Sequence, residues 1–420
     1  MMWWIWSLQT WACPAHASCL QVPIQTSLGL TKLDVQKWSP PQKNAEAMPL
    51  YFVAGGPGQS GLDVAPYLAP SLFTLGRDIV FYTPLGTQKE NNPFPCFGMI
   101  GSLQNIYSPE REVSGCVPKE GFDVSEYSSV RSAHHIEQIR QQLGDEKIVL
   151  LGSSYGSRVA QIYVQLYPEH VDSLIIDSGI PLHTFIGSSF VAEQIFRKRL
   201  GTSGMAIVDK IEKKLPEDVV FFDVSIQDDV MLHIDLDSFR LSLHNQLYRY
   251  SDQLNLYSLV EEIHRGNWDL LLRKLHHEQQ KAFSLGTYLS VFCQEDWLLL
   301  CAQETEEFFP FCSYMTKQCR LWPQKSNREW GQRIEHSVPA LILHGTEDPV
   351  SSISYAVRLQ HDWPLSLRVE FTEEAHGVLL SSCGIDVLKT FLSVEDTKNA
   401  NLPTCADMVR IYSSRGEITY

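Results

Sequence analysis

The sequence has few basic residues, and they do not cluster. Lys and Arg together number 34 against 49 Asp and Glu, which gives a formal net charge of −15 at pH 7. Proteins that bind nucleic acid use lysines and arginines to neutralise phosphates, so we expect no nucleic-acid partner. Long apolar runs are missing as well, because no stretch reaches about 18 consecutive apolar residues. We therefore expect no membrane span.

Closely spaced cysteine pairs are also absent. Structural zinc sites commonly use cysteines with only two residues between them, and the ten cysteines of this chain lie farther apart. An even number of well-separated cysteines fits disulfides formed in an oxidising compartment. We therefore predict no metal site, paired cysteines, and a periplasmic or secreted protein.

The N-terminal stretch MMWWIWSLQTWACPAHA lacks the basic region of a secretory signal. It does contain an apolar run and the triplet Ala15-His16-Ala17, which fits a cleavage site. Cleavage after Ala17 would discard Cys13 and leave an odd number of cysteines. We therefore expect Cys13 to stay in the folded domain, and a secretory signal to be atypical or to lie upstream.

Six apolar runs, each ended by turn residues, alternate with segments of helical periodicity. This alternation predicts an α/β fold whose mostly parallel sheet is covered by helices on both faces. The predicted strands are PLYFVA (49–54), DIVFY (78–82), KIVLL (147–151), DSLIID (172–177), PALILH (339–344) and LRVEF (367–371), and the predicted helices span 133–144, 157–168 and 354–360.

The alternation breaks between about 181 and 338. Amphipathic patterns over 239–250 and 256–275 indicate helices in this stretch, which also holds four of the ten cysteines. A helical insertion followed by a return to the sheet predicts a cap over an active site. We therefore divide the chain into a first part of the core (11–180), a helical cap (181–338) and a second part of the core (339–410).

The segment Gly152-Ser153-Ser154-Tyr155-Gly156 matches the pattern G-x-S-x-G between a predicted strand and a predicted helix. This is the context of a nucleophile elbow, a strained turn that exposes a serine oxygen at a helix N-terminus. We therefore predict that Ser154 is a nucleophile. Ser153 is the weaker candidate because it precedes the nucleophile position, and an ordinary glycine-rich turn is the alternative to both.

After such an elbow, the acid and the base follow in the order Asp, His. Asp348 and His376 each lie just past a predicted strand, where open α/β sheets bind their ligands. We predict that His376 takes the proton from Ser154 and that Asp348 orients and stabilises the imidazolium. Asp177 and Glu347 are alternative acids. Three other histidines fit the role of base less well. His344 ends a predicted strand and is expected to be structural, and His134 and His135 precede the serine in the sequence.

An oxyanion hole for this serine would combine the amide after the nucleophile with an amide from a loop that follows an earlier strand. The loop AGGPGQSG follows the first predicted strand, and its glycines let the backbone come close to a substrate. We predict the amides of Gly56 and Tyr155 as the two donors. A plain turn is the alternative interpretation of this loop.

Four motifs, AGGPGQSG, GSSYGSRVA, GTEDPV and EEAHG, together resemble the prolyl aminopeptidase and tripeptidyl aminopeptidase group of α/β-hydrolases. W-A-C-P…C-L-Q-V-P near the start and SVFCQEDW in the predicted cap are similar to that group too, so the resemblance runs from about Trp11 to Cys405. It implies an α/β-hydrolase fold and a serine exopeptidase that needs no metal or other cofactor. Its substrate would be a peptide with a free N-terminus.

The chain departs from the pattern of this group at three places. Thr83–Glu90 replaces the usual Asp-x-Arg-Gly-x-Gly-x-Ser, and only Gly86 keeps its place. His135 stands where the group tends to carry an acid, and Ala54 replaces a His that often precedes Gly-Gly-Pro-Gly. The altered 83–90 loop neighbours the predicted oxyanion region, so it bears on efficiency and specificity.

The resemblance also supports three disulfides, each between cysteines that neighbour one another along the chain: Cys13–Cys19, Cys96–Cys116 and Cys383–Cys405. Four cysteines in the predicted cap allow three connectivities. For these we predict Cys293–Cys319 and Cys301–Cys312.

Two adjacent acids, Glu295 and Asp296, lie between apolar runs of the predicted cap. An exopeptidase must recognise a free α-amine, which is mostly cationic near neutral pH. We predict that these carboxylates bind that amine. The alternative is that they pair with cap arginines or with cap helix ends.

We therefore expect a serine hydrolase, first of all a prolyl- or tripeptidyl-type aminopeptidase. A carboxylic-ester hydrolase is the second hypothesis, because both reactions pass through an acyl-enzyme. A non-catalytic binding protein of the same fold is the third. The altered 83–90 loop favours it slightly, and the intact Ser154, Asp348 and His376 argue against it.

Overall fold

The computed structural model describes most of the chain. It covers residues 13–27, 29–88, 93–94, 116–117, 122–182, 184, 189–224, 227–279, 283–302, 308–323, 325, 338–393, 403, 405, 409–413 and 416–418. The predictions that concern Cys96, Lys89, Glu90 and the N-terminal stretch up to residue 12 lie outside the described residues.

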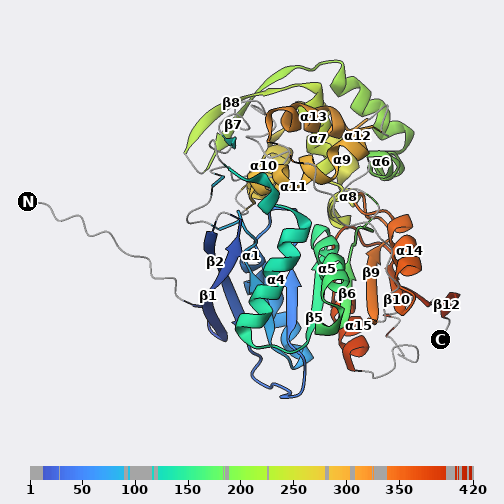
Figure 1. Ribbon diagram of the computed structural model, residues 1–420. Helices are drawn as coiled ribbons and strands as arrows, with labels where there is room; N and C mark the ends of the chain where they lie inside the picture. The colour runs from blue at the N-terminus through green and yellow to red at the C-terminus, as the bar shows by residue number, and fades with distance from the viewer. Residues whose placement is uncertain are drawn as a thin grey trace, which may run out of the picture.

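The core is a sheet in which ten strands of the described chain are hydrogen-bonded in the order β1-β2-β4-β3-β5-β6-β9-β10-β11-β12 (Figure 1). The central strands from β4 to β10 run parallel, and antiparallel strands flank them at both edges. The strands are β1 (Ala17–Thr26), β2 (Gly29–Trp38), β3 (Leu50–Val53), β4 (Ile79–Tyr82), β5 (Ile148–Ser153), β6 (Val171–Asp177), β9 (Ala340–Gly345), β10 (Ser366–Phe371), β11 (Val409–Ser413) and β12 (Gly416–Ile418).

The parallel part of the sheet consists of the six predicted strands, so the predicted α/β fold with a mostly parallel sheet is confirmed. The edge strands were not predicted. β1 and β2 are partly exposed and alternate between polar and apolar residues. Continuous apolar runs are typical only of strands that are buried on both faces.

Helices cover both faces of this sheet. One apolar cluster joins α4 (Ser129–Leu143), α5 (Tyr155–Leu166) and α14 (Ile353–Asp362) to one face, and a second joins α1 (Gly61–Leu72) and α15 (Ser382–Ser393) to the other. Successive strand residues point to opposite faces. In β4, for example, Val80 belongs to the first cluster and Phe81 to the second.

A long insertion between β6 and β9 forms a second layer at one end of the sheet (Figure 1). Two predicted helices are each divided: the pattern over 239–250 belongs to two helices, and Gly266, with φ +90°, separates two more within 256–275. A hairpin of β7 (Glu217–Asp223) and β8 (Asp228–Ile234) also interrupts the mostly helical insertion. Its helices are α6 (Ser189–Glu212), α7 (Leu236–Asn245), α8 (Tyr250–Leu254), α9 (Leu256–His264), α10 (Asp269–Gln279), α11 (Leu285–Glu295), α12 (Trp297–Cys301) and α13 (Phe311–Leu321).

Four of the five predicted disulfides are present: Cys13–Cys19, Cys293–Cys319, Cys301–Cys312 and Cys383–Cys405. Cys116 is also disulfide-bonded, and its predicted partner Cys96 lies outside the described residues. These bonds favour an oxidising compartment. Among the described helices, none combines the length and hydropathy needed to cross a membrane.

Candidate active site

The turn between β5 and α5 holds Ser154 in a strained conformation, with φ 53° and ψ −124°. Both glycines of the motif are required by close backbone approaches. A Cβ on Gly152 would lie 2.5 Å from the carbonyl oxygen of Gly156, and a Cβ on Gly156 would collide with the carbonyl oxygen of Val53. The sequence therefore folds here into the sharp strand-to-helix turn that the motif predicts.

Ser154, His376 and Asp348 lie in one hydrogen-bonded chain, although they are far apart in the sequence. His376 Nε2 is 2.9 Å from Ser154 Oγ, and His376 Nδ1 is 2.8 Å from Asp348 Oδ2. The two loops that carry His376 and Asp348 follow the neighbouring parallel strands β10 and β9. Parallel pairing thus brings their carboxyl ends to the same edge as the turn after β5.

Asp348 is fully buried and held as a carboxylate. Burial alone would raise the pKa of Asp348, but the charge of His376 and hydrogen bonds from His376 and Ser351 lower it to about 2. The amides of Val350 and Ser351 also donate to its Oδ1, at 2.8 and 2.9 Å. Burial alone would lower the pKa of His376, but the neighbouring Asp348 carboxylate raises it. The arrangement thus stabilises an imidazolium.

The alternative residues have other partners. Ser153 Oγ donates to Asp177 Oδ2 at 3.2 Å, and Asp177 Oδ1 accepts from the amide of Val378 at 2.9 Å. Asp177 therefore supports the loop after His376, whose imidazole bonds Asp348 instead. Burial raises the pKa of Asp177 to about 6. Glu347 forms ion pairs with a lysine and an arginine of α6, at 2.6 and 3.1 Å.

The other three histidines do not bond Ser154. His344 is fully buried in β9, and burial lowers its pKa to about 4. His135 is buried on α4, where burial lowers its pKa to about 3, and His134 Nδ1 lies 2.6 Å from Tyr167 Oη.

The loop after β3 passes directly beside the serine. A Cβ on Gly55 would lie 3.1 Å from Ser154 Cβ, so only a glycine fits there without displacement. Gly56 adopts φ +105°, a conformation that favours glycine. Tyr155 is the first residue of α5, and the first N–H groups of a helix lack an intrahelical acceptor. The two predicted donors therefore flank Ser154 on separate elements.

The altered 83–90 loop also lies near this region. A small cavity of ≈ 20 Å³ is lined by Pro84 and Leu85 from that loop together with Gly55, Gly58 and Tyr155. A cavity of this size has room for a water molecule. The altered 83–90 loop therefore lines a cavity together with residues of the predicted oxyanion region.

Glu295 and Asp296 are almost completely buried, with exposed fractions of 2% and 1%. Asp296 accepts two hydrogen bonds from the guanidinium of Arg158, at 2.8 and 2.9 Å. Glu295 accepts from the amide and the hydroxyl of Ser129, at 2.7 and 2.6 Å, and lies 3.5 Å from Arg158 Nη1. These contacts favour the alternative interpretation, in which the acids pair internally. Their partner arginine comes from the core rather than from the cap.

Sequence reasoning missed three residues of this region. Arg158 had a signal in the sequence, because it is the only charged residue of α5, and an arginine buried on such a helix requires a carboxylate partner. Ser129 had none, since its contact with Glu295 spans 166 positions. Tyr248, from the turn between α7 and α8, accepts from the His376 amide at 3.2 Å, and its ring packs edge-on against the imidazole.

Two family models match the chain. The model described as the alpha/beta hydrolase fold matches residues 48–209, and the model described as TAP-like protein matches residues 305–404. The first match contains the elbow and the loop after β3, and the second contains Asp348 and His376.

Known proteins are similar over part of their length. The putative hydrolase YuaR of Escherichia coli (strain K12) is 25% identical over 167 residues, 37% of this chain and 31% of that protein. The proline iminopeptidase of Saccharolobus solfataricus is 29% identical over 134 residues, 31% of this chain and 33% of that protein. The crystal structure of Mycobacterium smegmatis proline iminopeptidase is 15% identical, with 89% of this chain and 97% of that chain covered and a TM-score of 0.49.

The matched segments span about a third of the length of these two curated relatives. The family models confirm the predicted resemblance: the chain has the α/β-hydrolase fold, its C-terminal part matches the TAP-like model, and it is similar to the prolyl and tripeptidyl aminopeptidase group.

Proposed function

We propose that this protein is a serine hydrolase of the aminopeptidase type, which cleaves residues or short peptides from peptide N-termini through an acyl-enzyme. The observation that carries the proposal is the hydrogen-bonded chain from Ser154 Oγ through the His376 imidazole to Asp348. A serine in this chain loses its proton to the histidine as it attacks a carbonyl carbon. The aspartate stabilises the resulting imidazolium.

The proposed reaction needs no metal or other cofactor. His376 Nε2 takes the proton of Ser154 and later passes it to the leaving amine. The amides of Tyr155 and Gly56 stabilise the negative oxygen that forms when the serine attacks. A water activated by His376 then hydrolyses the acyl-enzyme in the same way.

The peptide substrate is supported by the TAP-like match and by a relative named proline iminopeptidase. An ester substrate is the second candidate, and one observation favours it. Glu295 and Asp296, the acids predicted to hold the amine, are already bonded to Ser129 and Arg158. Recognition of the amine by these two acids stays a prediction.

The four disulfides support a periplasmic or secreted location.

A fluorophosphonate probe tests the proposal. The wild type should be labelled at Ser154, and Ser154→Ala should not be labelled. An unlabelled wild type would instead favour the non-catalytic binding protein. Substrate preference then distinguishes an aminopeptidase from an ester hydrolase. The substrates compared are aminoacyl and tripeptidyl amides, with a free or a blocked N-terminus, and short acyl esters. Preference for free-amine amides supports the aminopeptidase, and preference for N-blocked substrates or esters contradicts it.

A further inference from the structure

Helix α11 of the insertion contacts the region of Ser154 at both of its ends. At its N-terminus, the amide of Ser284 donates to the carbonyl oxygen of Gly58 at 2.8 Å, and Phe283 forms an isolated antiparallel bridge with Gln59. A Cβ on Gly58 would collide with the carbonyl oxygen of Ser284. The start of α11 therefore holds the loop that carries Gly56.

The C-terminus of α11 is linked through Ser129 to Tyr155, whose amide is the other predicted donor. Glu295, the last residue of α11, bonds Ser129, and Ser129 Oγ lies 3.0 Å from Tyr155 Oη. The next residue, Asp296, binds Arg158, which follows Tyr155 by three positions on α5. The end of α11 is therefore bonded to the first turn of the helix that presents the Tyr155 amide.

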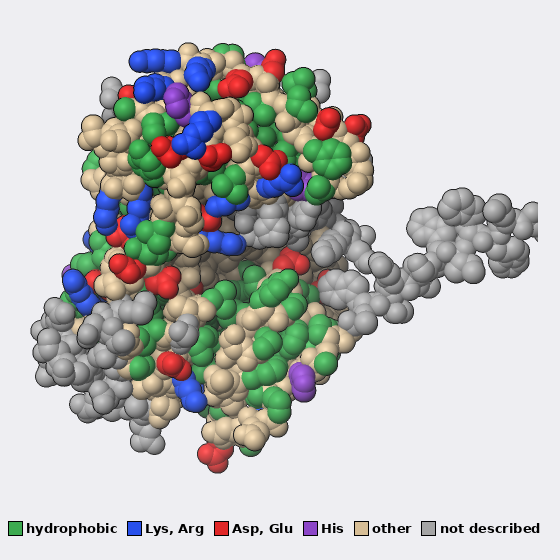
Figure 2. Space-filling view, turned by 180° about the vertical axis from the view of Figure 1, so that it is seen from behind, with side chains coloured by type: hydrophobic (Ala, Val, Ile, Leu, Met, Phe, Trp, Pro, Cys, Tyr) green, Lys and Arg blue, Asp and Glu red, His purple; other side chains and the backbone are tan. Residues whose placement is uncertain are grey.

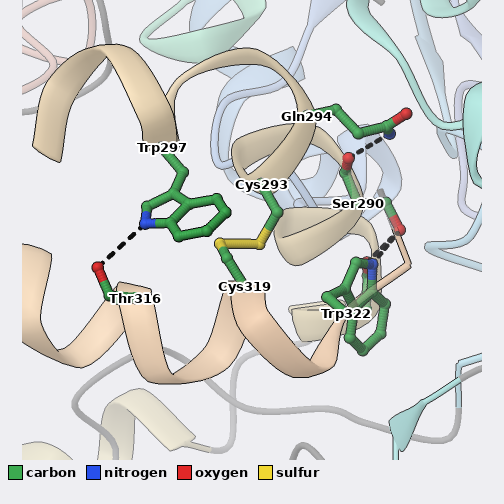
Figure 3. Close-up of a disulfide and its surroundings, with 8 residues drawn as sticks. Ser290, Cys293, Gln294, Trp297, Thr316, Cys319 and Trp322 are labelled. Atoms are coloured by element: carbon green, nitrogen blue, oxygen red, sulfur yellow. Dashed lines mark hydrogen bonds between the residues drawn. A yellow bond between two sulfur atoms is a disulfide. The ribbon is translucent and has the colours of Figure 1, made fainter. Parts of the chain in front are cut away.

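Helix α11 is itself fastened to α13 on its far side (Figure 3). The disulfide Cys293–Cys319 joins the two helices, and the indole of Trp322 donates to Ser290 Oγ at 3.2 Å. The indole of Trp297, which begins α12 directly after α11, donates to Thr316 on α13 at 3.0 Å. An α-helix of 11 residues is a stiff rod of about 16 Å. Its two ends therefore keep a fixed separation.

We infer that α11 is a brace that sets the spacing of the two oxyanion donors, with Glu295, Asp296, Arg158 and Ser129 as positioning residues. The inference rests on the proposed function. Oxyanion donors act at 2.7–3.1 Å from the developing charge, and a misplacement of about 1 Å has a large effect on rate. The loop of Gly56 and the start of α5 belong to different elements. Helix α11 is bonded to both, so it links their positions.

The N-terminal end is tested by a matched pair at Ser284. Ser284→Pro removes both the amide that donates to Gly58 and the capping hydroxyl, and the φ of −88° at this position lies just outside the range of about −65 ± 15° that proline adopts. Ser284→Ala removes the helix-capping hydroxyl but keeps the amide. With a short acyl ester, we expect Ser284→Pro to lower kcat roughly 10- to 100-fold, part of the loss of a whole donor. KM should change little, and Ser284→Ala should keep most of the kcat. Equal kcat values in the two variants would contradict the inference that α11 sets the spacing of the two donors.

The C-terminal end is tested by Asp296→Asn and Glu295→Gln, with Glu137→Gln as the matched control. Glu137 is also a buried acid, which bonds Arg140 of its own helix α4 and Tyr163 of α5, but it lies away from the turn at Ser154. We expect both brace variants to lose kcat equally on an aminoacyl amide and on a short acyl ester, while Glu137→Gln lowers only the melting temperature. A loss confined to the free-amine substrate would overturn the brace and support the amine-binding prediction.

Active sites are counted by fluorophosphonate end-point titration, so that kcat refers to folded enzyme. If Asp296→Asn does not fold, the comparison of Ser284→Pro with Ser284→Ala still tests whether α11 acts as a brace. Ser154→Ala separates the two proposals. If it keeps full ester hydrolysis, the proposed function and the brace both fail. If it is inactive while Ser284→Pro and Glu295→Gln keep the wild-type kcat, only the brace fails.

Discussion

The sheet and the insertion between β6 and β9 are stabilised in different ways. Every residue of β3, β4, β9 and β10 is buried, and these strands meet through backbone hydrogen bonds and apolar packing. The insertion carries two disulfides, and its buried Glu295 and Asp296 bond residues of the core. Its surface carries interspersed acidic and basic side chains (Figure 2). The sheet thus rests on backbone pairing and apolar packing, whereas the insertion adds cross-links and long-range bonds to an apolar core of its own.

This difference separates two kinds of mutational effect. The groups proposed to do the chemistry, Ser154, Asp348 and His376, all follow strands of the sheet. The insertion supplies contacts that hold them, such as the carbonyl oxygen of Tyr248 on the His376 amide. Substitutions in the strand-end loops should therefore abolish turnover, whereas substitutions in the insertion should change stability and the positions of the reacting groups.

The largest effect is expected at Ser154. Ser154→Ala should lower kcat by about 10⁶-fold, the loss found when a triad serine is removed. Ester hydrolysis in the purified protein measures this loss. Ser153→Ala is the neighbouring control. Because Ser153 Oγ bonds Asp177 rather than His376, it should lose far less activity. Similar losses in both variants would contradict the assignment of the nucleophile.

Asp348→Asn should follow, with a loss of about 10⁴-fold in kcat. It should also shift the pH profile. His376 acts as a base only when it is neutral, so activity rises as the pH passes the pKa of His376 from below. The Asp348 carboxylate raises that pKa above its ordinary value of 6.5. Its removal should move the acid limb to lower pH. If Asp177→Asn instead gives the larger loss and the larger shift, Asp177 is the acid.

The ion pairs of Arg158 should dominate the stability of the contact between core and insertion. Arg158→Met removes the cation that pairs with the buried Asp296 carboxylate and lies 3.5 Å from Glu295, and breaking such a buried pair costs about 3–5 kcal/mol. Urea unfolding followed by circular dichroism measures the change. Arg273→Met, which removes an exposed ion pair within α10, is the control and should leave the urea midpoint nearly unchanged. Equal midpoints for the two variants would mean that Arg158 does not stabilise this contact.

The disulfides should have the smallest effects. Replacing Cys293 and Cys319 by serine removes a cross-link between residues 26 positions apart and should lower the free energy of unfolding by about 3 kcal/mol. Replacing Cys13 and Cys19 at the sheet edge removes a cross-link between residues only 6 positions apart and should lower the free energy of unfolding by about 2 kcal/mol. Urea unfolding compares the two double variants. If the Cys13/Cys19 variant loses more stability than the Cys293/Cys319 variant, the disulfide of the insertion does not stabilise the protein more than the disulfide of the sheet edge.

The sequence by itself determined the parallel sheet and the identity of the residues that meet at its edge. Apolar runs that end in glycine, proline or a polar residue are local features, and parallel strands bring their carboxyl ends together whatever the rest of the chain does. This is why Ser154, Asp348 and His376 could be named from motifs and order alone. The disulfides Cys13–Cys19 and Cys383–Cys405 join cysteines that neighbour one another along the chain, and the family resemblance supported their prediction.

Only the tertiary structure decided what Glu295 and Asp296 contact. Two adjacent acids between apolar runs must have partners, but the sequence does not say whether a ligand amine or a distant arginine is one of them. The partner Arg158 lies 138 positions away from Asp296, and Ser129 lies 166 positions away from Glu295. No local pattern links such residues, because their contact depends on how the insertion packs on the sheet. The hairpin β7–β8 and the edge strands β1 and β2 also escaped prediction, because these strands are partly exposed and lack a continuous buried apolar run.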